Sequence, residues 1–172
     1  PELYIGGEFS IDPATLQPQT RAVPGGWAIP AKPIRFSVGR FAMLAALDLL
    51  VKEGARVLLP DYLCEAQVAI LKKYGVEFQF YRLKEDLTPD FESLRKWQKD
   101  HTAIVVINYF GLIDMEKVGQ SLRHGFPKAD LVADCAQEPF NIPPLDLYRF
   151  AYTSLRKVLP VPDGAELYGR DL

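Results

Sequence analysis

The stretch that decides the fold is Ala103-Ile104-Val105-Val106-Ile107, a continuous apolar run in which four residues are β-branched. Such a run is typical of a strand that is buried on both faces, because a strand with one exposed face shows alternating polar residues. Arg56-Val57-Leu58-Leu59-Pro60 and Asp130-Leu131-Val132-Ala133 are also short apolar runs of strand type. Residues 76–81 alternate between apolar and polar, which predicts a strand with one face partly exposed.

Helical patterns separate these predicted strands. The helix candidates are residues 41–47, 65–74, 91–97 and 115–122. The first is a buried run that Gly54 terminates, and Gly75 terminates the second. Asp90 is expected to cap the third. Since strands alternate with helices through short connections, the sequence predicts an α/β fold, a three-layer sandwich with a mainly parallel sheet. Ligands of such sheets bind outside the carboxyl ends of the strands.

The length of the chain predicts one domain preceded by an irregular arm. Its 172 residues have room for a single sizeable core. Residues 1–35 are rich in proline and glycine and are expected to form an irregular N-terminal arm. This leaves residues 36–172 for the folded domain.

Composition narrows the class of protein. The net charge of −2 gives no electrostatic case for a nucleic-acid or anionic membrane partner. No apolar run reaches membrane-spanning length, and the N-terminus lacks the pattern of a signal peptide. Cys64 and Cys135 match no metal or redox spacing, so we expect no metal site and a cytoplasmic location. His101 and His124 stand in polar stretches and are not expected to be catalytic.

Functional side chains follow the predicted strand ends. Val132-Ala133-Asp134-Cys135-Ala136-Gln137 predicts a strand that runs into an acidic turn, and Ser154-Leu155-Arg156-Lys157 places a lysine just past another strand. A carboxylate and a lysine at neighbouring strand ends can bind a pyridine-aldehyde cofactor by both its ring nitrogen and its aldehyde. The start of a helix at Ser37-Val38-Gly39-Arg40 could bind a phosphate group. The segment Pro60-Asp61-Tyr62-Leu63-Cys64 could supply a stacking side chain.

Taken in their order along the chain, the four segments resemble the DegT/DnrJ/EryC1/StrS family of pyridoxal 5'-phosphate (PLP)-dependent aminotransferases, over about residues 36–164. The resemblance implies PLP as the cofactor and the large domain of the type I PLP-dependent transferase fold. On this basis the large domain is expected to be incomplete and the small C-terminal domain to be absent. The partners implied are a small-molecule amino donor, a keto acceptor and a second copy of the chain in a homodimer.

The resemblance also implies the catalytic residues. Lys157 takes the place of the Schiff-base lysine, and Asp134 that of the carboxylate that keeps the pyridine nitrogen protonated. Gln137 stands where the family has a polar side chain near the phenolic oxygen of the cofactor. We expect the Lys157 amine to be desolvated, because burial favours the uncharged amine that attacks an aldehyde.

The remaining cofactor contacts follow from the same resemblance. Gly39 and Arg40 are expected at the phosphate group, with Ser154 as a second contact. For the residue that stacks on the ring, two alternatives stay open: Tyr62 by a local shift of the chain, or Cys64 at the usual position of the family's aromatic residue.

The function implied is amino-group transfer to a keto sugar or another small keto substrate. The alternative is a non-catalytic truncated relative that keeps the α/β fold and the dimer surface without turnover. Arg40, Cys64 and Ala165 depart from the family's pattern. A dinucleotide-binding domain is disfavoured, because no G-x-G-x-x-G motif follows the first strand.

Overall fold

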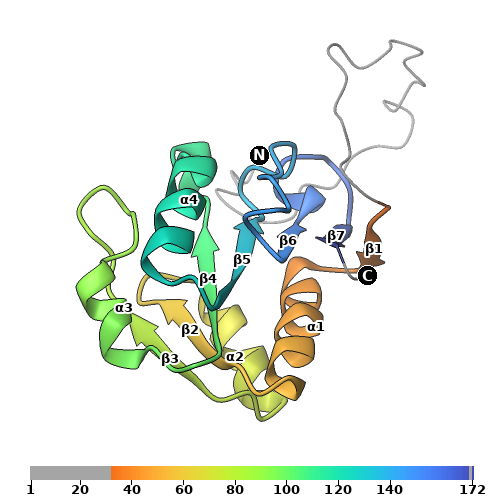
Figure 1. Cartoon of the computed structure of the whole chain (residues 1–172). Coiled ribbons are helices and arrows are strands. Elements are labelled where there is room, and N and C mark those ends of the chain that lie inside the picture. The colour runs from red at the N-terminus through yellow and green to blue at the C-terminus, as the bar shows by residue number, and fades with distance from the viewer. Residues whose placement is uncertain (1–31, 171) are drawn as a thin grey trace, which may run out of the picture.

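The computed structural model describes residues 32–170 and residue 172. Its centre is a seven-stranded sheet in the order β1-β7-β6-β5-β4-β2-β3, with β3 and β1 at the two edges (Figure 1). The strands are β1 (Ile34–Phe36), β2 (Arg56–Pro60), β3 (Phe78–Tyr81), β4 (Thr102–Ile107), β5 (Ala129–Cys135), β6 (Phe150–Thr153) and β7 (Ala165–Gly169).

The centre of the sheet is parallel. Strands β3, β2, β4, β5 and β6 pair in parallel, whereas β7 is antiparallel to β6 and β1 is antiparallel to β7. The mainly parallel sheet that the sequence predicts is therefore confirmed. The sequence did not predict β1 and β7. Strand β1 includes Ile34 and Arg35, which had been assigned to the irregular arm, and residues 1–31 of that arm lie outside the described residues.

Helices cover both faces of the sheet. They are α1 (Gly39–Lys52), α2 (Glu65–Lys73), α3 (Phe91–Trp97) and α4 (Met115–Gly125). Helices α1 and α2 pack on the face that carries Val105 and Val132. Helices α3 and α4 pack on the opposite face, which carries Ile104 and Leu131. Every residue of β4 is buried, as its apolar run predicts, and the three-layer sandwich is confirmed.

The predicted ends of the helices agree with their backbone geometry. Gly54 and Gly75 follow α1 and α2 with φ of 89° and 70°, a left-handed conformation that glycine adopts without steric cost. Asp90 caps α3 by accepting a hydrogen bond from the Glu92 N–H at 3.0 Å. Among the described residues, no helix has the length and apolar character needed to cross a bilayer.

One boundary that matters for the site differs from the prediction. Strand β5 continues to Cys135, and Asp134 pairs in register with Ile107 of β4 and Tyr152 of β6. The expected acidic turn at Asp134 is therefore wrong, because the turn begins only after the strand. Pairing on both sides fixes the backbone of Asp134 more firmly than a turn would.

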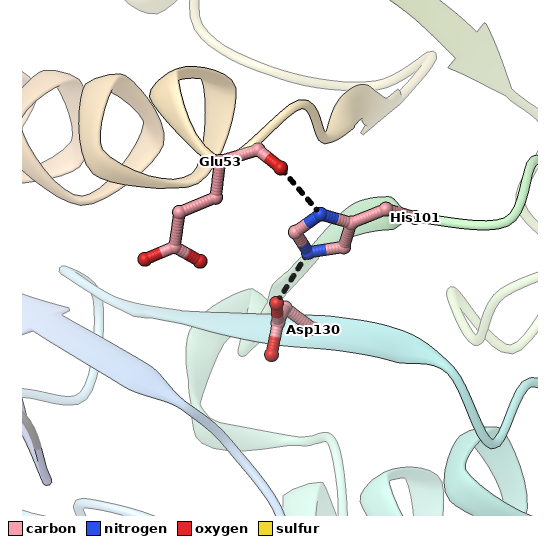
Figure 2. A group of neighbouring side chains, drawn as sticks. All are labelled: Glu53, His101 and Asp130. Carbon is pink, nitrogen blue, oxygen red and sulfur yellow. Dashed lines mark hydrogen bonds and ion pairs between the residues drawn. The ribbon is translucent and has the colours of Figure 1, made fainter.

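Charged side chains form a network at the amino ends of the strands, opposite the carboxyl edge. Figure 2 shows His101 between the end of α1 and strand β5, with Nδ1 3.2 Å from the carbonyl oxygen of Glu53 and Nε2 2.8 Å from Asp130 Oδ2. Arg149 donates to both carboxylate oxygens of Glu53, at 2.6 and 2.7 Å, and to Asp130 Oδ2 at 3.1 Å. The network links the end of α1 to the starts of β4, β5 and β6.

This network is built from ion pairs. Ligand atoms of Glu53, His101 and Asp130 lie within 4.8 Å of one another, which is close enough for one cation to bridge them. The Arg149 guanidinium already bonds both carboxylates, however, and its hydrogen bond lowers the pKa of Glu53. The hydrogen bond to Asp130 raises the pKa of His101. The positive charge between the two acids is thus supplied by the protein's own side chains.

Raising the pH is expected to weaken this network. The folded-state pKa of His101 lies above its ordinary value of 6.5, so the stability it contributes is fully present below that value and is lost as the pH rises through the folded pKa. We expect urea denaturation between about pH 5.5 and about pH 8.5 to show a loss of unfolding free energy that His101→Gln reduces. His124→Gln, at an exposed position in α4, is the matched control. Identical pH profiles for wild type and His101→Gln would contradict the assignment.

Candidate functional site

Asp134 is a buried acid at the carboxyl edge of the sheet, with 3% of its surface exposed. Its Oδ1 accepts a hydrogen bond from the Ala136 N–H at 2.8 Å, and its Oδ2 accepts one from Gln67 Nε2 at 2.7 Å. Among the described residues, no cationic side chain forms an ion pair with it. Burying a carboxylate without a positive partner is unfavourable. A ligand with a cationic N–H group therefore fits this position.

Two residues that the sequence did not identify complete the surroundings of Asp134. Gln67 Nε2 also lies 3.0 Å from the hydroxyl oxygen of Tyr152, the residue opposite Asp134 in β6. Burial, followed by the charge of Asp134, raises the pKa of Tyr152 well above its ordinary value. The sequence does contain a hint of the role of Gln67. It lies one helical turn before Ile70 and Leu71, on the buried face of α2, and a polar side chain on a buried face needs a hydrogen-bond partner.

The start of α1 packs on the end of β6. Gly39 is buried, and a Cβ atom at this position would lie 3.2 Å from the carbonyl oxygen of Thr153 and 3.3 Å from the Cβ of Ser154. A side chain at this position would therefore crowd the end of β6, and glycine avoids this. The structure brings the two predicted phosphate contacts Gly39 and Ser154 together. The Arg40 side chain is exposed, with its guanidinium 5.9 Å from the centre of the Phe41 ring.

Lys157 lies in a closed loop that follows β6. It ends a short 3₁₀ helix, and its backbone N–H donates to the carbonyl oxygen of Ser154 at 3.2 Å. The loop returns to its base, where the Leu155 N–H donates to the carbonyl oxygen of Gly164 at 2.9 Å. Gly164 N–H in turn donates to Ser37 before α1, at 2.8 Å. The Lys157 side chain is exposed, so the described residues of one chain do not supply the desolvation expected of it.

The predicted stacking segment lies in the loop between β2 and α2. The Tyr62 ring is 59% exposed and stacks on Tyr109, with ring centroids 5.6 Å apart and an angle of 24° between the planes. The Tyr109 hydroxyl donates a hydrogen bond to the carbonyl oxygen of Tyr62. Cys64, directly before α2, is also exposed. An aromatic face is therefore available at Tyr62, and it is supported from behind by a second ring.

Gln137 lies in the turn after β5 and holds the loop after β4. Its Oε1 accepts a hydrogen bond from the Phe110 N–H at 2.9 Å. Because the amide oxygen is used in this way, the NH₂ group of Gln137 is left as a donor, which suits an acceptor such as a phenolic oxygen. Phe110 has a left-handed backbone with φ of 55° and is 64% exposed.

The site residues thus fall into two connected groups. Asp134, Gln67 and Tyr152 are joined by hydrogen bonds, and Gly39 is in contact with Ser154 two residues beyond Tyr152. Since β5 and β6 are neighbours, both groups lie at the same edge of the sheet. Four of the predicted site residues are exposed in the single chain: Arg40, Tyr62, Cys64 and Lys157.

Comparisons with known proteins assign the fold. No family model and no curated protein sequence matches the chain. Among solved structures, the sugar aminotransferase CalS13 from Micromonospora echinospora is 19% identical, with a TM-score of 0.63, over 78% of this chain and 41% of that one. The PLP form of the putative sugar aminotransferase Spr1654 from Streptococcus pneumoniae is 16% identical, with a TM-score of 0.63, over 80% and 41%.

The likeness extends beyond sugar aminotransferases. A tyrosine aminotransferase from Leishmania infantum is 18% identical, with a TM-score of 0.61, over 78% of this chain and 39% of that one. Identities this low establish the fold and leave the reaction open. The chain spans about two fifths of the length of these structures. It has the α/β fold of the large domain of type I PLP-dependent transferases.

Proposed function

We propose that this chain binds PLP at the carboxyl ends of β5 and β6 and acts within an aminotransferase of the DegT/DnrJ/EryC1/StrS family. The observation that carries the proposal is the buried Asp134 carboxyl, which has neutral hydrogen-bond donors and pairs in the sheet with Tyr152, two residues before the Ser154 that Gly39 approaches. Its substrates would be a small amino donor and a keto acceptor, with a keto sugar as the preferred acceptor. Residues 36–172 would form the cofactor-binding domain.

Two residues would take part in the chemistry. When bound, PLP supplies the electron sink that makes the α-proton of an amino substrate removable. Asp134 would accept a hydrogen bond from the pyridine N–H and keep the proton on that nitrogen. Lys157 would hold the aldehyde carbon through Nζ, and the same Nζ, once released, would move a proton as general base and acid.

Other residues would position the cofactor. The N-terminal end of α1 at Gly39 and the Ser154 hydroxyl would bind the phosphate, because free N–H groups at a helix start attract anions. Arg40 would add a positive charge nearby. Tyr62 would cover the ring, with Cys64 as the alternative, and the Gln137 NH₂ group would donate to the phenolic oxygen.

A second copy of the chain would complete the site. Lys157 is exposed in one chain, and the exposed side chains of Tyr62, Phe110 and Leu112 add apolar surface on the loops that follow β2 and β4. We therefore infer a homodimer in which the partner excludes water from Lys157. We also propose a cytoplasmic location, because Cys64 and Cys135 are both free cysteines. The same exposure also favours the second candidate, a non-catalytic relative that binds no cofactor and keeps only the fold and the dimer surface.

Titration with PLP tests the role of Lys157. We expect the wild-type chain to develop the visible absorbance of a lysine-bound cofactor, and borohydride to fix the label on the peptide that contains Lys157. Lys157→Ala should lose the absorbance and the label completely. Lys128→Ala, an exposed lysine between α4 and β5, is the matched control and should behave as wild type. Equal spectra for wild type and Lys157→Ala, with no labelled peptide, would refute the cofactor proposal.

The phosphate contact can be tested separately with pyridoxal, which lacks the phosphate group. Ser154→Ala should weaken PLP binding by roughly tenfold or more, since a hydrogen bond to a charged group contributes about 1.5–3 kcal/mol. Its affinity for pyridoxal should stay the same. Ser121→Ala, an exposed serine in α4, serves as the control in spectroscopic titrations. An equal loss for both ligands would argue against a phosphate contact at Ser154.

A further inference from the structure

We infer that Gln67 is a positioning residue, which orients the Asp134 carboxylate toward the pyridine nitrogen of a bound cofactor. The inference rests on the proposed function and adds a residue to it. Gln67 lies outside the four segments that carry the family resemblance, because it belongs to the body of α2. Its assignment comes from the contacts of its amide group.

The amide group of Gln67 is held in one orientation. Its Nε2 lies 2.7 Å from Asp134 Oδ2 and 3.0 Å from the Tyr152 hydroxyl oxygen. An NH₂ group has two hydrogens, so each of these acceptors can receive one. A flipped amide would turn its own oxygen toward the carboxylate and lose the bond to it. The side chain therefore fixes Oδ2 while the Ala136 N–H fixes Oδ1 at 2.8 Å.

The groups around Asp134 come from different parts of the fold. Ala136 follows Asp134 in the chain, and Tyr152 is its neighbour in the sheet. The Tyr152 phenol stays protonated, because burial and then the charge of Asp134 raise its pKa well above the ordinary value. Within residues 32–170, Gln67 is the residue that bonds to Asp134 from a helix, and that helix directly follows the loop with Tyr62. It thus fixes the carboxylate relative to the ring-stacking segment.

The chemistry of the donor matters as much as its position. A lysine or arginine at this place would neutralise the carboxylate and remove its attraction for a protonated pyridine nitrogen. A neutral amide orients the carboxylate and leaves its charge for the ligand. Glutamine therefore satisfies the buried oxygen without competing with the cofactor for the charge.

The test compares two ligands in the 172-residue chain. One is PLP, and the other is the PLP analogue in which carbon replaces the ring nitrogen. For Gln67→Leu we expect about tenfold weaker PLP binding in spectroscopic titrations and an unchanged affinity for the carbon analogue. Gln67→Met, which has a similar length but no hydrogen-bond donor and no charge, should show the same selective loss. Gln120→Leu, at an exposed position in α4, is the matched control.

A second comparison asks whether Gln67 acts through Asp134. In an Asp134→Asn background, Gln67→Met should cause no further loss of PLP affinity, because neighbours that act as a unit are not additive. Equal losses for both ligands, unchanged PLP binding in the Gln67 variants, or full additivity with Asp134→Asn would each overturn the inference and leave the proposed function standing. A wild-type chain without a lysine-bound cofactor would instead overturn the proposed function, and this inference with it.

Discussion

The parallel strands must be covered on both faces, and the rest of the structure depends on this constraint. Every residue of β4 is buried, so α1 and α2 on one side and α3 and α4 on the other must each present an apolar surface. The crossover helices that provide this cover also bring the carboxyl ends of β2, β4, β5 and β6 to one edge. Residues far apart in the sequence become neighbours there for topological reasons alone.

The sequence predicted the helices and strands that a local pattern of residues defines, such as an unbroken apolar run or a terminating glycine. The apolar run of β4 and the helix end at Gly54 are local features, and both were identified correctly. Strands β1 and β7 could not be found in this way. In the part of the chain that the structure describes, Ile34–Phe36 pairs with β7 alone, so its extended form depends on a distant contact that short-range periodicity does not record. The end of β5 at Cys135 was missed because sheet pairing on both sides extended the strand.

Site residues could be predicted where the type of residue and its motif indicate the role. They could not be predicted where the role depends on a tertiary contact between distant elements. Gly39 and Ser154 were expected at one place, and the packing of α1 on β6 brings them into contact. Gln67 and Tyr152 were missed, because their link to Asp134 joins a helix and two strands. The surroundings of Lys157 depend on what covers its loop, and residues within the motif carry no information about that.

The loop from Leu155 to Gly164 leaves the sheet and returns to it through one hydrogen-bonded base. Because Gly164 is tied both to Leu155 and to the entrance of α1, movement or a change of length in the middle of the loop need not displace β6 or β7. The lysine is thus carried on an exchangeable unit. Other loops grafted onto the same base would change the position of the lysine and its neighbouring side chains. The sheet and Asp134 would be expected to stay as they are.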